Sequence, residues 1–283
     1  MVDPMEYRTI STVVTDENLL EHVLANASRI ARHAGAHLDV YCLGLDRTRP
    51  DFYFTGATAV MLQDNLAQAH AQAEALEARV REILRGADFN WAVTAMTSQI
   101  ITLNELVAQR TRFSDLVVLP KPYGEGRGHE YEAILEAAMF NGDVPVLVLP
   151  DEGVIDPEIE RIVVAWNNSS EAMRATRAAM PWLKAAQDVC ITIIDPPPHS
   201  PDRSDPGGAF SQWLSRHDVR AEVSVLARTL PRVSDVLMRH VTDRNAGMVV
   251  MGAYGHTRFR EAIMGGATRH MLELTTVPVL MMH

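Results

Sequence analysis

Short apolar runs alternate with longer segments of helical periodicity along the whole chain. In the first half, runs rich in Val, Ile and Leu cover residues 10–15, 38–45, 90–96, 115–120 and 144–150. Continuous apolar runs of this length, separated by amphipathic segments, are typical of parallel strands joined by crossover helices. The pattern therefore predicts an α/β fold.

The same pattern starts again after an acidic, proline-containing segment at 151–158. Five more apolar runs follow, at residues 161–166, 189–195, 221–227, 247–252 and 277–283. The halves end alike, in FNGDVPVLVLP and ELTTVPVLMMH, where a helix end leads into Val-Pro-Val-Leu. An internal repeat of this kind predicts two tandem domains, at 1–150 and 158–283.

The two halves differ after their second strand. Residues 59–85 of the first half have apolar positions at alternating spacings of four and three, which predicts a long helix. The second half has DPPPHSPDRSDPGG instead, which predicts a loop and a short helix. Packing of the long helix on its own sheet is the favoured interpretation, and a dimer seam is the alternative.

Composition places the chain among globular proteins. Of 283 residues, 47% are apolar and 22% are charged, and the net charge of −10 disfavours nucleic acid and anionic membranes as partners. The sequence has neither an apolar run long enough to span a membrane nor a signal-peptide pattern, which predicts a cytoplasmic protein. Cys42 and Cys190 lie in apolar runs without metal-ligand spacing, so we expect buried free thiols.

The segment GAYGHTRFREAIMGG, at 252–266, follows the fourth strand of the second half. Ligands of parallel sheets bind at the carboxyl ends of the strands. Gly252 and Gly255 permit a sharp turn and a close approach of the backbone to a ligand. Gly265 and Gly266 present N–H groups without side chains at the start of the last helix, whose dipole favours an anion. This spacing predicts a phosphate-binding site.

The charges around these glycines agree with phosphate binding. Between residues 252 and 269, Glu261 is the only acidic residue, and the basic side chains are His256, Arg258, Arg260 and Arg269. A local excess of positive charge attracts phosphate in spite of the negative total. The alternative is that the glycines only form a tight turn and that the arginines are a solvated face.

This segment and the VPVLMMH that follows resemble the Gly-x2-Gly-x9-Gly-(Ser/Thr) signature of the universal stress protein family. Residues 162–183, IVVAWNNSSEAMRATRAAMPWL, resemble the family's first strand and helix, and the repeat makes the chain similar to a tandem member. The resemblance implies a five-stranded, Rossmann-like parallel sheet of order 3-2-1-4-5 in each half. It also implies binding of ATP or a related adenine nucleotide, with or without Mg²⁺.

The resemblance further implies a set of ligand contacts in the second half. The glycines of the signature would hold the phosphates and ribose, and Asn167 would face the ribose or adenine. Gly266 stands where the family usually has Ser or Thr, and Asn167 replaces the usual Asp. The positions expected to contact the nucleotide are Ala165, Trp166, Asn167, Asp195, Met251, Gly252, Gly255, His256, Arg258, Gly265, Gly266, Ala267 and Thr268.

The corresponding segment of the first half, LPKPYGEGRGHEYEAILEA, departs further from the signature. Pro120 and Pro122 stand where glycines would be needed, and Glu125 adds negative charge. We therefore expect a degenerate site there and one nucleotide per chain. Asp16 remains at the end of the first strand, where capping of the following helix is its favoured role.

In the implied strand order, the apolar last strand of each half lies at a sheet edge, where unpaired backbone groups favour pairing. We expect the two strands to pair within the chain as an intramolecular pseudo-dimer, with a homodimer of chains as a further arrangement. The expected function is an ATP-binding stress-response or signalling module. It is not expected to be an enzyme, because GxxxxGK[ST], HExxH and GxSxG are missing. The alternatives are a nucleotide-free interaction protein, a protein for another small ligand, and a weak ATPase.

Overall fold

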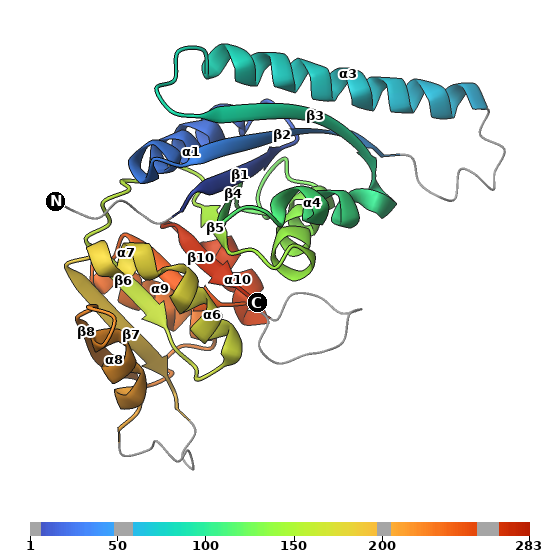
Figure 1. Ribbon diagram of the computed structural model, residues 1–283. Coiled ribbons are helices and arrows are strands. Elements are labelled where there is room, and N and C mark those ends of the chain that lie inside the picture. The colour runs from blue at the N-terminus through green and yellow to red at the C-terminus, as the bar shows by residue number, and fades with distance from the viewer. Residues whose placement is uncertain (1–6, 48–58, 197–204, 254–265) are drawn as a thin grey trace. The chain divides into compact units, whose positions relative to one another are not determined.

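The computed structural model describes residues 7–47, 59–196, 205–253 and 266–283 (Figure 1). They form two compact units. The first unit consists of residues 7–122 and 126–144, and the second of residues 123–125 and 145–283. Both units are α/β, as the alternating pattern of the sequence predicts.

The first unit has four parallel strands in the order β3-β2-β1-β4. Its strands are β1 (Thr9–Val14), β2 (His37–Asp46), β3 (Trp91–Gln99) and β4 (Leu116–Pro120). Its helices are α1 (Leu20–Ala34), α3 (Ala59–Ile83), α4 (Leu103–Thr111) and α5 (His129–Glu136), with short helical turns at Ile100–Thr102 and Ala137–Asn141.

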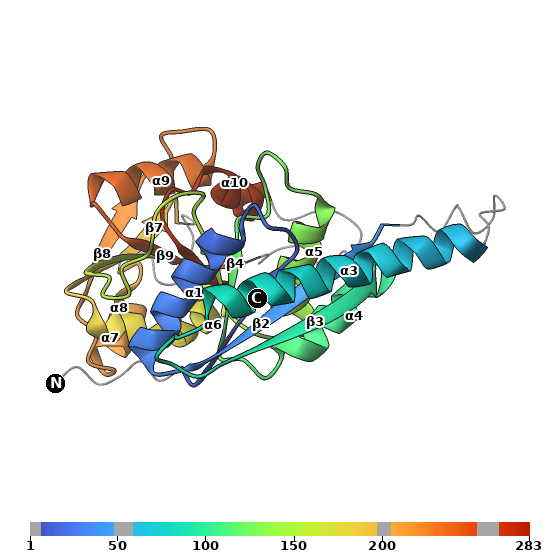
Figure 2. The same ribbon diagram turned by 90° about the horizontal axis from the view of Figure 1, so that it is seen from above.

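The long helix α3 lies along β2 and β3, as both views show (Figures 1 and 2). Ala69, Ala73, Leu76 and Val80 of its apolar stripe are buried. A β-carbon on Gly44 of β2 would lie only 1.7 Å from the carbonyl oxygen of Ala69, so the helix and strand backbones approach closely. This confirms the interpretation that α3 packs on its own sheet.

The second unit has six strands in the order β5-β10-β9-β6-β7-β8. The strands are β5 (Val146–Leu149), β6 (Arg161–Ala165), β7 (Asp188–Ile194), β8 (Ala221–Leu226), β9 (Met248–Gly252) and β10 (Val279–Met282). The helices are α6 (Ser170–Ala178), α7 (Met180–Ala185), α8 (Gly208–Ser215), α9 (Val233–Asp243) and α10 (Gly266–Leu274). From β8 to β10, the second repeat has the parallel order 3-2-1-4-5, as predicted.

The last strands of the two repeats pair with each other. Strand β5 runs antiparallel to β10, with Val148 opposite Val279 and Leu147 opposite Leu280. All four of these side chains are fully buried. The pairing that was expected from two apolar edges is therefore present, and it places the last strand of the first repeat in the second compact unit.

The structure confirms the expectation for the two cysteines. Both Cys42 and Cys190 are buried free thiols. In the ranges that the structure describes, the helices are too short or too polar to cross a membrane.

Candidate functional site

The candidate site lies at the carboxyl ends of β6, β7 and β9. Ala165, the last residue of β6, is in register with Met251 of β9 on one side and Thr192 of β7 on the other. The chain leaves β6 toward β7 and leaves β9 toward β10, so the connections diverge between β6 and β9. Such a topological switch point is where open α/β sheets bind ligands.

Trp166 directly follows β6 and is held by its backbone and its ring. Its N–H donates to the carbonyl of Thr192, with 2.9 Å between nitrogen and oxygen. Its ring stacks on Phe210 of α8, with centroids 3.8 Å apart and planes 6° from parallel. Phe210 is buried, whereas Trp166 stays half-buried, so part of a rigid aromatic side chain is accessible at the strand end. Phe210 was not predicted, because only the fold brings α8 to this strand end.

Asn167 belongs to the turn that starts α6. Its Oδ1 atom accepts a hydrogen bond from the N–H of Ser169 at 3.2 Å. The hydroxyl of Ser169 in turn accepts from the N–H of Ala172 at 3.1 Å, which caps the helix. The exposed side chain of Asn167 therefore has a local structural role that is independent of a ligand.

Gly252 meets the same helix start. A β-carbon there would lie 2.4 Å from the backbone nitrogen of Ala172 and 2.7 Å from the carbonyl carbon of Glu171. The close approach predicted for Gly252 is present, but its partner in the structure is the first turn of α6. Contact of Gly252 with a nucleotide stays a prediction.

The first turn of α6 also carries a negative charge. The pKa of Glu171 is lowered, chiefly because its carboxylate accepts a hydrogen bond from its own backbone N–H, and further by the hydroxyls of Ser170 and Ser169.

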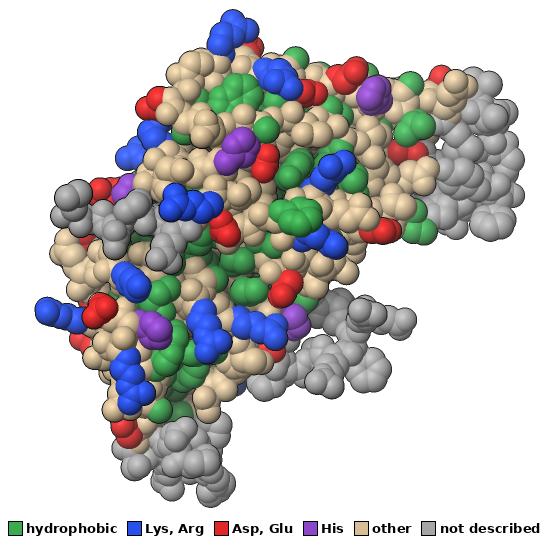
Figure 3. Space-filling view, in the orientation of Figure 1, with side chains coloured by type: hydrophobic (Ala, Val, Ile, Leu, Met, Phe, Trp, Pro, Cys, Tyr) green, Lys and Arg blue, Asp and Glu red, His purple; other side chains and the backbone are tan. Residues whose placement is uncertain are grey.

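Basic side chains lie on the same helix and its neighbours. Arg174, one turn after Glu171, donates from Nη1 to the carbonyl oxygen of His283 at 2.8 Å. Figure 3 shows basic side chains spread over the face that carries α6, α7 and α8. The exposed ones on these helices are Arg174, Arg177 and Lys184.

Helix α10 supplies the described part of the predicted phosphate site. Gly266 is its first residue, and in the part of the chain that the structure describes, the atom nearest to a β-carbon there would be in the imidazole of His270, at 3.8 Å. Gly266 and Ala267 are exposed, whereas Thr268 is 4% exposed, so its side chain belongs to the core. Gly255, His256, Arg258 and Gly265 lie outside the described residues.

Asp195 is placed just beyond β7. It is exposed and has a left-handed backbone with φ of 49°. Its N–H donates to the carbonyl of Leu226 at 2.9 Å, which continues the ladder between β7 and β8. The structure thus brings Asp195 to the same end of the sheet as Ala165, Trp166 and Met251.

The equivalent position in the first unit is filled by side chains of the protein. Oδ1 of Asp16 accepts from the N–H groups of Asn18 and Leu19, at 2.8 and 3.3 Å, in the turn before α1. The N-cap residue of α1 is Leu19, without a side-chain cap, so the expected capping by Asp16 is wrong and Asp16 shapes the preceding turn instead. Its other oxygen, Oδ2, accepts from the hydroxyl of Tyr131 in α5. Burial, followed by this contact with Asp16, raises the pKa of Tyr131.

Glu130, which precedes Tyr131 in α5, also contacts a residue that follows a strand. Glu130 forms an ion pair with Arg47, which follows β2. The first turn of α5 therefore lies across the carboxyl ends of β1 and β2. It contacts Asp16, which follows β1, and Arg47, which follows β2. Neither Tyr131 nor Arg47 was predicted, because their partners lie far away in the sequence.

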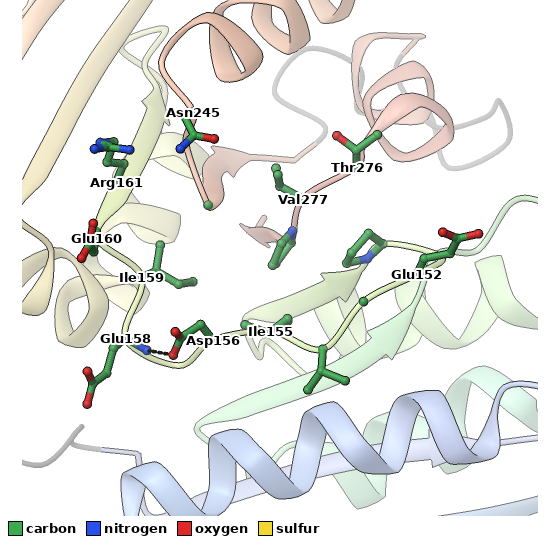
Figure 4. Close-up of a pocket in the computed structure, with 15 residues that line it drawn as sticks. Glu152, Ile155, Asp156, Glu158, Ile159, Glu160, Arg161, Asn245, Thr276 and Val277 are labelled. Carbon is green, nitrogen blue, oxygen red and sulfur yellow. Dashed lines mark hydrogen bonds between the residues drawn. The ribbon is translucent and has the colours of Figure 1, made fainter.

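A pocket of about 360 Å³ opens at the opposite end of the second sheet (Figure 4). It is lined by the segment before β6 and by the residues that precede β9 and β10, such as Asn245 and Val277. Its charged lining consists of Glu152, Asp156, Glu158, Glu160 and Arg161. This excess of carboxylates disfavours phosphate, and the pocket contains none of the predicted site residues.

The described residues also limit metal and thiol chemistry. Within the ranges given above, no three His, Cys, Asp or Glu side chains are grouped so that they could hold a metal ion. Sγ of Cys190 lies 3.5 Å from Nε2 of His240. Burial raises the pKa of this thiol, which keeps it protonated at neutral pH.

Comparison with known proteins finds similarity to universal stress proteins. The model of the universal stress protein family matches residues 158–283. The universal stress protein Slr1230 of Synechocystis sp. is 25% identical over 171 residues, which are 59% of this chain and 57% of that protein. The match thus spans little more than half the length of this relative.

Solved structures share the fold over both repeats. A universal stress protein from Archaeoglobus fulgidus has a TM-score of 0.69 at 14% identity, covering 95% of this chain and 94% of that one. A putative universal stress protein from Pseudomonas aeruginosa has a TM-score of 0.61 at 15% identity, covering 98% and 93%. At these identities the likeness concerns the fold.

Proposed function

We propose that this chain belongs to the universal stress protein family, whose model matches residues 158–283, and that it binds one molecule of ATP or a related adenine nucleotide in its second repeat. It would act as a stress-response or signalling module rather than as an enzyme. One contrast carries the proposal. Tyr131 and Glu130 make contacts across the carboxyl end of the first sheet, whereas Gly266 at the equivalent helix start of the second repeat is exposed. Among the described residues, no atom would lie closer than 3.8 Å to a β-carbon at Gly266.

The residues present suit a nucleotide. The N–H groups at the start of α10 would hold phosphate oxygens, since a helix start combines free donors with a favourable dipole. The half-buried Trp166 offers a planar surface for a base, beside Ala165 and Met251. Mg²⁺, when bound, would be held mainly through the phosphates, as is usual for this ion.

The test begins with the full-length chain as purified. Denaturation and chromatography of the released small molecules identify any nucleotide that it carries, and calorimetric titration of the stripped protein with ATP gives the stoichiometry. We expect about one ATP per chain. Two per chain would contradict the closed first site, and none would contradict nucleotide binding.

Two variants locate the site. Gly265→Val should abolish most of the binding, because a branched side chain blocks the phosphate, while the circular dichroism spectrum stays that of the wild type. Asp16→Asn, in the first unit, should leave the affinity unchanged. ATP turnover that persisted after His256→Ala would contradict a hydrolytic role for this histidine, whereas turnover that this change removed would support the weak ATPase.

A further inference from the structure

Tyr123 lies against α10, although it stands 143 positions earlier than the first residue of that helix. The segment 123–125 belongs to the same compact unit as residues 145–283. Cζ of Arg269 lies 4.9 Å from the centroid of the Tyr123 ring, which is within the range of a cation–π contact. Tyr123 is half-buried.

The loop that carries Tyr123 is the segment in which the first repeat lacks the glycine signature. Gly124 and Gly126 have φ of 144° and 75°, a region that favours glycine, so the chain turns sharply on both sides of Glu125. The glycines of this loop shape a turn beside the tyrosine. The loop therefore has a structural role after the loss of its expected phosphate contacts.

Arg269 is the fourth residue of α10 and lies in its first turn. Its Nε atom donates to Oε1 of Glu273 at 2.9 Å, so the side chain runs along the helix away from Gly266. The guanidinium is thereby held between Tyr123 and Glu273 and does not itself point at the helix start. Its effect on a ligand at that start is indirect.

The first turn of α10 has little intrinsic helix stability, so side-chain contacts matter for its position. It begins with glycine, which is a poor helix former, and both Gly266 and Ala267 are exposed. The described contacts of this turn include the burial of Thr268 and the contact of Arg269 with Tyr123. Phosphate binding by backbone N–H groups requires that they keep their position within about 0.5 Å.

We propose that Tyr123 is a positioning residue for the nucleotide site of the second repeat. By stacking on Arg269 it holds the first turn of α10 in place, so that the loop of the degenerate first site stabilises the retained second one. This inference rests on the proposed function, because it assumes that phosphates bind at the start of α10.

Four single variants of the full-length chain, and the double variant of Tyr123→Ala with Arg269→Gln, test the proposal. Tyr123→Ala removes the ring, Tyr123→Phe keeps a ring without the hydroxyl, and Arg269→Gln removes the cation. Phe89→Ala is the matched control, since Phe89 makes a similar contact with Arg32, at 5.5 Å, in the first unit. Each variant is titrated with ATP. Without nucleotide, amide hydrogen exchange is measured at residues 270–273, because these are the first amides of α10 whose acceptors lie in its first turn.

We expect Tyr123→Ala and Arg269→Gln each to weaken ATP binding about two- to fivefold, the ratio that corresponds to an exposed cation–π contact. The double variant should be no weaker than either single one. Exchange at the start of α10 should accelerate by a similar factor. Tyr123→Phe and Phe89→Ala should behave as wild type in both measurements.

Two results would overturn the role of Tyr123. One is wild-type affinity and exchange in Tyr123→Ala, and the other is an equal loss in Tyr123→Phe, which would assign the effect to the hydroxyl. A wild-type chain that bound no ATP would overturn the proposed function itself, and the exchange measurement alone would then decide whether Tyr123 holds the helix.

Discussion

Gly252 and Ala172 are so close that a β-carbon on the glycine would lie 2.4 Å from the backbone nitrogen of the alanine. Both sides of this contact are backbone, and neither can rotate away as a flexible side chain would. We expect Gly252→Ala to lower the free energy of unfolding by about 2 kcal/mol or more, as overpacking does. Urea unfolding followed by circular dichroism measures the change.

Gly266→Ala serves as the control for this prediction, because the nearest atom to its β-carbon would be 3.8 Å away. Its free energy of unfolding should stay equal or rise by about 0.5 kcal/mol, since alanine favours a helix more than glycine does. Equal destabilisation by the two substitutions would contradict the packing described for Gly252.

Gly266→Ser should strengthen nucleotide binding. No described atom would lie closer than 3.8 Å to the added β-carbon, and a hydroxyl at the start of α10 adds a donor for a phosphate oxygen. The expected gain is about threefold to tenfold, the ratio that corresponds to one ordinary hydrogen bond. Calorimetric titration with ATP measures it, and Gly266→Ala, which lacks the hydroxyl, should show no gain.

Trp166 should report on the bound nucleotide. Because its half-buried ring is fixed on Phe210 at the strand end, a base placed there would change its emission. We expect ATP to alter the tryptophan fluorescence of the wild type and to leave that of Trp166→Phe nearly unchanged. Trp91→Phe, a change in the first unit, should keep the full response. Loss of the response in that variant would contradict the assignment of the signal to Trp166.

Tyr131 should make the protein sensitive to alkaline pH. Its pKa is raised by burial and by Asp16, so between pH about 10 and its folded pKa the unfolded chain loses a proton that the folded chain keeps. Stability is therefore fully present below pH 10 and falls above it. Tyr131→Phe should cost about 1 to 2 kcal/mol at neutral pH, as the loss of one hydrogen bond does.

Above pH 10, the free energy of unfolding of Tyr131→Phe should fall less steeply than that of the wild type. The difference in slope should approach about 1.4 kcal/mol per pH unit, the contribution of one proton. Urea unfolding at several pH values between 9 and 11.5 gives both slopes. Parallel slopes would mean that Tyr131 ionises alike in the folded and unfolded chains.

A fragment of residues 158–283 should homodimerise or aggregate. It contains β10 but lacks β5, so the buried edge at Val279, Leu280 and Met281 loses its partner strand. An exposed apolar edge favours pairing with another chain. Light scattering at micromolar concentration measures the mass, and a monodisperse monomer would show that β10 does not need β5.

The strands were predictable from the sequence because both faces of a parallel sheet are covered, which makes each strand a continuous apolar run. The run at 161–166 is β6 (Arg161–Ala165), and the run at 115–120 is β4 (Leu116–Pro120). The helix at 59–85 was predictable for the same kind of reason, since α3 buries one regular stripe. Local periodicity thus determines most of the fold.

The contacts around the candidate site were less predictable, because they join residues that are distant in sequence. Tyr131 reaches Asp16, and Phe210 reaches Trp166, and no local pattern marks either partner. Gly252 shows a second limit of prediction from sequence. A glycine in a signature suggests bare backbone for a ligand, whereas the structure shows that the backbone of α6 needs the same space.

The antiparallel pair of β5 and β10 also bears on the order in which the chain folds. During translation, β5 leaves the ribosome before any strand of the second repeat has been made, and β10 follows β6 to β9. The nascent chain must therefore carry β5 with one edge unpaired while about 130 further residues are synthesised, and pairing over such a sequence distance is slow. Throughout that interval β5 can associate with other strands, so it is the segment of the first repeat at which a chaperone would be expected to act.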